Sequence, residues 1–227
     1  MSRSRARYQP NRVWSNPFSR RIDYRLEGRQ PPQSVPTSTA DEILSRARSL
    51  IIAAGYNGFS YADIASEVGI RKPSIHHHFP TKADLVRTLV LRYRQEAEAG
   101  MAEMERHVED PLELLRAYVN YWRTCIADAS DPFCVCALLV SELPILPEEV
   151  AAEVTAHCRA LSAWVASILE RGVQQGRIRI ATTPRAEAEA FMATVHGAML
   201  SARAYGEPET FALIITPLLD RLSVQGT

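Results

Sequence analysis

Closely spaced helix breakers between residues 55 and 81 constrain the fold of this chain more than any other feature. These breakers are Gly55, Gly58, Gly69, Pro73 and Pro80. Ser60 suits the N-cap of a short helix that ends at Gly69, because Gly readily adopts the left-handed conformation of a helix C-terminus. Pro73 suits the first turn of a second short helix, and Pro80 disfavours helical geometry at Phe79. The spacing predicts two short helices joined by a tight turn.

Longer helices are expected on both sides of this pair. Apolar residues recur every three or four positions over residues 41–54, which indicates an amphipathic helix. The sequence Thr81-Lys82-Ala83-Asp84 resembles a capping box with Asp in place of Glu, and it opens a long helix. Three helices of this kind form a helix-turn-helix unit, whose second short helix enters the major groove of DNA.

The rest of the chain is predicted to be helical as well, so the expected fold class is all-α. Breaks at Pro and Gly separate helices at about 112–127, 132–143, 148–175, 185–205 and 208–222, without the alternating pattern of a sheet. We expect a basic arm at 1–39, a helix-turn-helix domain at 40–86, and a ligand-binding and dimerisation domain at 87–227. The arm is rich in Pro and lacks periodicity, which is typical of a disordered or extended segment.

The charge is distributed unevenly, although the chain carries 26 basic and 26 acidic residues. Residues 1–39 hold eight Arg against two acidic residues, a balance of +6, and residues 40–95 hold eight basic against five acidic, +3. Residues 96–227 hold ten basic against nineteen acidic, a balance of −9. A basic front half points to a polyanionic partner, which can be nucleic acid, a membrane surface or an acidic protein.

Two interpretations of the basic arm stay open. It can follow phosphates or enter a minor groove and add salt-dependent affinity, or it can be a solvated extension, for instance from a misassigned start codon. The chain has no run of about 18 apolar residues and no apolar signal region, so we expect a cytoplasmic protein without a membrane partner. Its four Cys are clustered, which favours reduced thiols.

Residues 59–85, FSYADIASEVGIRKPSIHHHFPTKADL, closely resemble the N-terminal domain of the TetR family, the tetracycline-repressor-like bacterial transcription regulators. The helical remainder fits the C-terminal domain of that family in length and layout. The resemblance implies a homodimer that binds double-stranded operator DNA with a palindromic sequence. It also implies repression of nearby genes, and release of the DNA when a small-molecule effector enters the C-terminal domain.

The candidate DNA-binding residues are Ser60, Tyr61, Arg71, Lys72, Ser74, His76, His78 and Lys82. Lys72 and Ser74 lie at the start of the expected recognition helix, where side chains reach base edges or phosphates. The resemblance places His76 where many members have a DNA-facing Tyr, and it matches Lys82 to a phosphate-contacting Lys. It also matches Ser60 and Tyr61 to backbone-contacting positions and turns His78 to the DNA backbone, while Arg71 is a candidate reader of bases or phosphates. We expect His77 to be packed or partly exposed.

Two groups of metal-binding residue types are judged not to form metal sites. Three successive His at 76–78 diverge by about 100° each around a helix and cannot converge on one ion. Cys134, Cys136, His157 and Cys158 do not have the spacing of a zinc finger. We therefore expect no metal and no cofactor. The chain also lacks a Gly-x-Ser-x-Gly elbow, a phosphate-binding Gly loop and a His-Glu-x-x-His motif, so we expect no enzyme.

The sensor half, which is the expected ligand-binding and dimerisation domain at 87–227, contains the Cys-rich segment FCVCALLVSEL at 133–143. This segment looks like the corresponding segment of a TetR subgroup that includes electrophile- and acrylate-responsive repressors. Cys134 falls on the cysteine of that subgroup, with Phe133 in place of the preceding Gly. Either Cys134 or Cys136 can be a reactive sensor, or a buried Cys can act as a small hydrophobe. The ligand-binding candidates are Trp122, Cys134, Trp164 and His196, for which core packing or a dimer interface is the alternative.

The last two expected helices carry apolar stripes that resemble the four-helix dimer interface of the family. The stripe residues are Phe191, Val195, Ala198 and Met199, then Phe211, Ile214, Leu218 and Leu219. Packing of this helix pair within one chain is the alternative. A transcriptional activator, or an effector-free co-regulator of the same fold, is the competing function.

Overall fold

The computed structural model describes residues 38–127 and 133–224. Within these ranges the chain forms helices and one isolated bridge, between Ile178 and Ser223, so the all-α prediction is confirmed. Most of the predicted basic arm lies outside the described residues. Ser38 and Thr39, which we assigned to the arm, instead cap and begin the first described helix.

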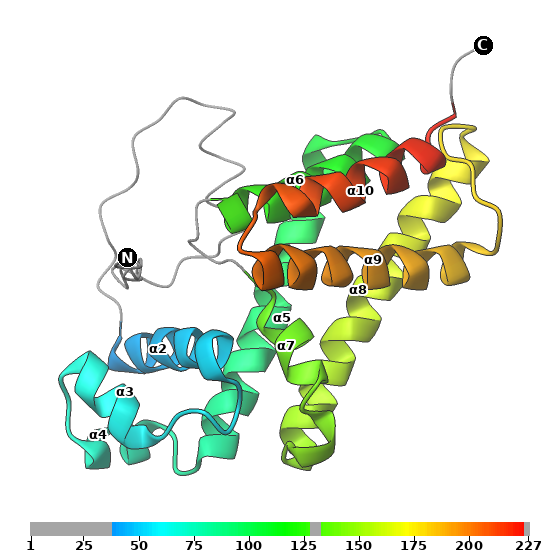
Figure 1. Ribbon diagram of the computed structural model, residues 1–227. Helices are drawn as coiled ribbons and strands as arrows, with labels where there is room; N and C mark the ends of the chain where they lie inside the picture. The colour runs from blue at the N-terminus through cyan, green and yellow to red at the C-terminus, as the bar shows by residue number, and fades with distance from the viewer. Residues whose placement is uncertain (1–37, 128–132, 225–227) are drawn as a thin grey trace, which may run out of the picture.

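The N-terminal unit consists of α2 (Thr39–Ala54), α3 (Tyr61–Val68), α4 (Lys72–His78) and the start of α5 (Lys82–His107), as Figure 1 shows. α4 is too short to be stable by itself and depends on tertiary packing. Ile75 is fully buried and Phe79 nearly so, as expected from their spacing of four residues. They join Ile43, Ile64 and Leu85 in the core beneath the short helices.

Capping explains where these helices begin and end. Ser38, Ser60 and Thr81 each form a capping box with the Asp three residues later, so Asp replaces the usual Glu in all three. The side chain of Asp63, for example, accepts from the backbone N–H of Ser60 at 2.7 Å. Gly69 ends α3 in the left-handed conformation, with φ 76° and ψ 29°, which confirms the predicted turn.

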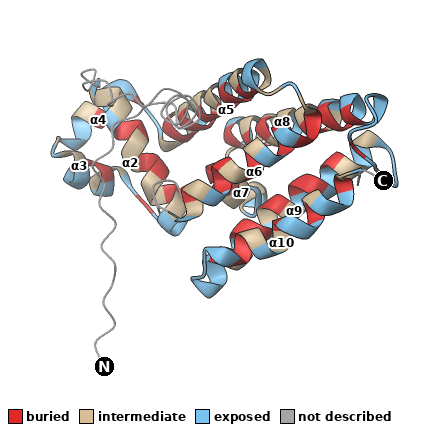
Figure 2. Cartoon of the chain, turned by 90° about the horizontal axis from the view of Figure 1, so that it is seen from above, coloured by how far each residue is buried: buried red, intermediate tan, exposed pale blue. Residues whose placement is uncertain are grey.

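The long helix α5 belongs to both halves of the molecule. It packs against α2 at its start and against α6 (Pro111–Ala127) and α8 (Glu148–Gln174) further along. The C-terminal half is completed by α7 (Val135–Val140), α9 (Pro184–Tyr205) and α10 (Glu209–Leu222). Viewed from above, the buried residues line the faces that these helices turn toward one another (Figure 2).

The predicted single helix at 132–143 is wrong. Of this range the structure describes residues 133–143, which contain α7 (Val135–Val140) and the first residue of a 3₁₀ turn, η1 (Leu143–Ile145). Cys134 adopts an extended conformation and is the N-cap of α7, and Pro144 stands within η1. Because Pro lacks the N–H that an α-helix needs, the chain ends α7 early and turns toward α8.

Candidate functional site

The α4 helix presents one polar face to solvent and anchors the other in the core. Lys72, His76 and His78 are exposed, whereas Ile75 between them is fully buried. His77, which we did not expect to contact DNA, is exposed as well. The exposed face therefore gathers a lysine and several imidazoles on one short helix.

The start of α4 carries two further predicted DNA contacts. Arg71 is exposed and is the N-cap of α4, and its side chain forms no capping hydrogen bond. Ser74 lies in the first turn and is half-buried, and its backbone N–H donates to the carbonyl oxygen of Arg71 at 2.9 Å. Arg71 thus adds a second cation beside Lys72, while contact of Ser74 with DNA stays a prediction.

The position of His76 fixes the orientation of its ring. Its Nδ1 lies 3.1 Å from the carbonyl oxygen of Pro80, and its ring centroid lies 4.8 Å from that of Tyr61. Since a carbonyl oxygen can only accept, Nδ1 carries the proton in this contact. Nε2 of the neutral ring is then an acceptor, which suits an N–H donor on a base edge, and the protonated ring can donate to phosphate.

The hydroxyl groups of Tyr61 and Ser60 form hydrogen bonds within the N-terminal unit. The hydroxyl of Tyr61 lies 2.9 Å from the carbonyl oxygen of Phe79 and 2.6 Å from that of Thr81, so it ties the start of α3 to the turn before α5. Burial raises the pKa of Tyr61 to about 12. The hydroxyl of Ser60 is engaged in the N-cap of α3. Sequence patterns assigned both residues to the DNA backbone, and in this structure their hydroxyls make internal contacts.

Lys82 lies across the turn that precedes α3. Its Nζ donates to the carbonyl oxygen of Phe59 at 2.5 Å and lies 4.0 Å from the ring centroid of Phe59 and 4.8 Å from that of Tyr56. Burial lowers the pKa of Lys82, and the charges of Glu142 and Asp63 act in the opposite direction. The ammonium group that we predicted to contact phosphate thus lies over the aromatic rings of Tyr56 and Phe59.

A buried cluster of thiols and imidazoles lies where α7 meets the rest of the sensor half. The Sγ of Cys134 lies 3.9 Å from Nε2 of His157, and Cys136 and His196 also interact with this thiol. The neighbouring Cys136 and the two imidazoles lower the pKa of Cys134. Burial, with the adjacent Cys134, raises the pKa of Cys136. Cys134 is therefore the thiol of this pair that ionises more readily.

This thiol cluster reaches the N-terminal unit through a chain of side chains in contact. The ring of His157 lies 5.2 Å from the ring of Tyr93, and the guanidinium carbon of Arg48 lies 4.8 Å from that same ring. All three side chains are buried. Sequence patterns indicate His157 only as a possible metal ligand and do not point to Tyr93 or Arg48. The sequence signal that could have identified Arg48 is its spacing, because it lies one turn after Leu44 on the buried face of α2.

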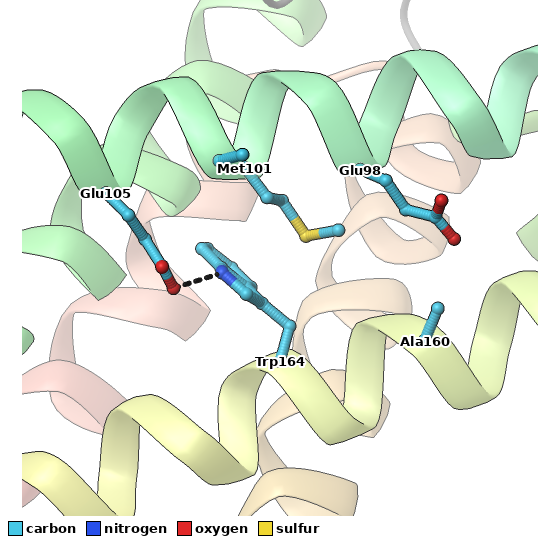
Figure 3. A pocket seen from close by; sticks show the side chains of 6 residues that line it. Glu98, Met101, Glu105, Ala160 and Trp164 are labelled. Atoms are coloured by element: carbon cyan, nitrogen blue, oxygen red, sulfur yellow. Dashed lines mark hydrogen bonds between the residues drawn. The ribbon is translucent and has the colours of Figure 1, made fainter.

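The remaining ligand-binding candidates lie in two different places. Trp164 lines a groove of about 230 Å³ between α5 and α8, together with Glu98, Met101, Glu105 and Ala160 (Figure 3). Its indole N–H donates to Glu105 at 2.8 Å, and its ring lies 5.4 Å from that of Tyr118. Trp122 is buried on α6. Among the described residues, its indole N–H and the Tyr118 hydroxyl form no hydrogen bond of ordinary geometry.

The predicted dimer stripes on α9 and α10 are used largely within the chain. Phe191, Val195, Ala198, Met199, Phe211 and Leu218 are buried in the monomer, which favours the alternative of packing within one chain, while Ile214 and Leu219 are half-buried. The helices present other residues to solvent: Leu200 is 51% exposed and Leu213 is 75% exposed. Gly197 lies one turn before Leu200 and has open space around its α-carbon. The apolar face available to a partner is therefore centred on Leu200 and Leu213.

Neither a metal cluster nor a membrane span is found in the described part of the chain. Within residues 38–127 and 133–224, no three side chains of His, Cys, Asp or Glu are arranged to hold one metal ion. Over the same residues, no helix combines the length and apolarity needed to cross a membrane.

Comparison with known proteins gives consistent matches to both halves of the chain. Residues 43–89 match the family model described as bacterial regulatory proteins, tetR family, and residues 111–218 match the tetracyclin repressor-like C-terminal domain. A solved TetR-family transcriptional regulator from Agrobacterium tumefaciens is 63% identical, with a TM-score of 0.80, over 82% of this chain and 97% of that chain.

More distant relatives extend this result. A TetR transcriptional regulator from Legionella pneumophila is 24% identical with a TM-score of 0.75, over 83% of this chain and 98% of that chain, which shows the shared fold. The transcriptional activator FasR from Mycolicibacterium smegmatis is 24% identical over 141 residues, which is 61% of this chain. The match spans 63% of FasR, just under two thirds of its length.

Proposed function

The chain belongs to the TetR family of bacterial regulatory proteins, and from that premise we propose that it is a homodimeric, effector-responsive repressor of transcription in the cytoplasm. The observation that carries DNA binding is α4, where Lys72, His76 and His78 are exposed while Ile75 anchors the helix. Two such helices in a dimer fit a palindromic operator with half-sites about one DNA turn, roughly 34 Å, or a multiple of it apart.

Selection of bound sequences from a random DNA pool tests this function. We expect the purified full-length protein at near-physiological salt to enrich a palindrome. Placing the selected site between a promoter and a reporter gene then distinguishes repression from activation. Activation is the second candidate, favoured by the name of the FasR relative. Recovery of no enriched sequence, or of one without two-fold symmetry, would contradict the proposed dimeric operator reader.

We propose that the effector is an electrophile with a carbonyl oxygen, and that Cys134 is its target. The lowered pKa of Cys134 favours the nucleophilic thiolate, with His157 beside it to hold the proton. Addition to an α,β-unsaturated carbonyl forms a C–S bond, moves the π electrons toward the carbonyl and returns the proton to the α-carbon. The Tyr118 hydroxyl, which lies beside the Trp122 indole N–H, is a buried donor suited to that oxygen.

Release of the operator follows from thermodynamic linkage between the effector site at Cys134 and the DNA-binding site on α4. An adduct at Cys134 that favours a conformer with misplaced α4 helices must weaken operator binding. By reciprocity, bound operator DNA must disfavour the adduct by the same factor. The contacts from His157 through Tyr93 to Arg48 join the thiol cluster to α2 of the N-terminal unit. A bulky adduct in this packed region has no room without displacement of these side chains.

We predict that Cys134→Ser abolishes release of the operator by N-ethylmaleimide. In the wild type, modification should weaken operator binding by roughly 5- to 150-fold, the usual range of allosteric coupling. The half-buried Cys158 on α8 supplies the control, since Cys158→Ser should leave the response intact. Fluorescence anisotropy of labelled operator measures release, and mass spectrometry locates the adduct. An undiminished response in Cys134→Ser would remove Cys134 as the sensor.

A further inference from the structure

The sensor half holds the C-terminal end of α2 at two points. Both carboxylate oxygens of Glu142 accept from the backbone N–H of Tyr56, at 3.1 and 3.0 Å. From α9, Nη2 of Arg203 donates to the carbonyl oxygen of Ile52 at 2.8 Å. Ile52 lies in the last turn of α2, where carbonyl groups lack partners within the helix. Polar groups of the DNA-binding unit are thus satisfied by residues from far along the chain.

Gly55 leaves the space that the Glu142 carboxylate occupies in this contact. Its φ of 78° is in the region that favours glycine. A Cβ built at position 55 would lie 2.4 Å from Oε1 of Glu142, much closer than real side chains approach. The absence of a side chain at residue 55 is therefore what admits the carboxylate to the Tyr56 amide.

The Glu142 contact lies between the sensor core and the residues that shape the DNA-binding unit. On the sensor side, Glu142 follows α7 (Val135–Val140) by two residues, and the N-cap of that helix is Cys134. On the other side, the ring of Tyr56 lies under Lys82, whose ammonium group holds the carbonyl oxygen of Phe59. Phe59 is followed directly by Ser60, the N-cap of α3.

We propose that Glu142 is a positioning residue for operator binding. By holding the Tyr56 amide, its carboxylate couples the orientation of the α3–α4 pair to that of α7, and so links changes in the sensor core to operator affinity. A fixed orientation favours simultaneous docking of both recognition helices of a dimer, because less freedom is lost on binding. This role rests on the proposed operator binding, and it does not depend on which effector acts or on reaction at Cys134.

A double-mutant cycle with operator DNA tests the role. Leu139→Ala creates a cavity beneath α7, because Leu139 is a fully buried residue of that helix, which packs against α2 and α8. Operator affinity is measured for the wild type, Leu139→Ala, Glu142→Ala and the double variant. Glu148→Ala, which removes an exposed carboxylate at the start of α8, is the matched control. Circular dichroism verifies that each variant is folded.

We expect Glu142→Ala to weaken operator binding roughly two- to thirtyfold, the range by which single residues modulate the coupling between sites. Leu139→Ala should change operator affinity in the wild-type background and have little further effect in Glu142→Ala. Glu142→Gln should restore most of the affinity, because its amide oxygen still accepts from Tyr56. Amide exchange followed by NMR should show faster exchange at Tyr56 in Glu142→Ala and not in Glu148→Ala, which links the affinity change to this contact.

Three results would overturn the role: unchanged operator affinity in Glu142→Ala, additive effects in the cycle, or an equal loss in Glu148→Ala. These failures differ from failure of the proposed function. If the wild-type protein selects no DNA sequence, the operator-binding function is wrong and the positioning role is lost with it. If the wild type selects an operator and the cycle is additive, only the role of Glu142 is wrong.

Discussion

A chain with both Leu200→Glu and Leu213→Glu is expected to be a folded monomer whose operator affinity is lower by about 100-fold or more, because the second half-site contact no longer benefits from effective concentration. Both side chains are exposed on the monomer, on α9 and α10. Their replacement therefore leaves the core of each chain intact. In a two-fold symmetric dimer, the two substitutions together would place four carboxylates in one apolar contact, where burial of unpaired charge is costly.

Light scattering after size-exclusion chromatography measures the oligomeric state, and gel shift with the selected operator measures affinity. Val173→Glu is the matched control, because it adds one charge at an exposed apolar residue of α8, outside the α9–α10 face. We expect this variant to remain dimeric and to bind operator normally. A dimer that persists in the double variant, with unchanged operator affinity, would contradict the assignment of this face.

The positions of most helices could be predicted because local signals are strong along this chain. Gly69, Pro73 and Pro80 separate α3, α4 and α5 as expected, and Ser60 and Thr81 cap α3 and α5. These signals act over three or four residues and are readable in sequence. The segment around α7 was predicted less well, since the extended conformation at Cys134 has no comparable local signal.

The sequence indicated which residue types form the functional regions, but it did not indicate which residues those side chains contact. An apolar stripe identifies a buried face, and sequence alone does not say whether the same chain or a partner buries it. This is why a dimer interface and packing within one chain both stayed open for Phe191 and Phe211, which the structure buries within the chain. Glu142 was not predicted, because its partner Tyr56 is 86 residues away and no periodic pattern connects them.

The contacts of the Lys82 ammonium group could not be predicted from the sequence either. Its place at the start of a helix was predicted correctly, and the ring contacts with Tyr56 and Phe59 depend on how the turn before α3 folds back. Contact of Lys82 with phosphate stays a prediction, and it requires the ammonium group to leave or share the Phe59 carbonyl oxygen. DNA contact by Ser60 and Tyr61 stays a prediction in the same sense.

The double variant Lys72→Ala, His76→Ala is expected to lose sequence-selective binding, with operator affinity lower by roughly 1,000-fold or more, since each good base contact contributes about 1–3 kcal/mol and the dimer makes both contacts twice. Both side chains are exposed on α4, so the fold should be unaffected. If Lys72 binds phosphate, the Lys72→Ala variant alone should lower affinity for all sequences. It should also reduce the slope of log affinity against log salt by about one for each phosphate that is no longer neutralised.

His77→Ala is the matched control for His76→Ala, because both imidazoles are exposed neighbours on α4 and only His76 is held by Pro80 and Tyr61. The orientation of the His76 ring is therefore determined before DNA binds, which lowers the entropic cost of its contact. We expect His77→Ala to bind the selected palindrome as the wild type does. Equal enrichment of one palindrome by the wild type and the double variant would show that α4 is not the helix that reads the operator.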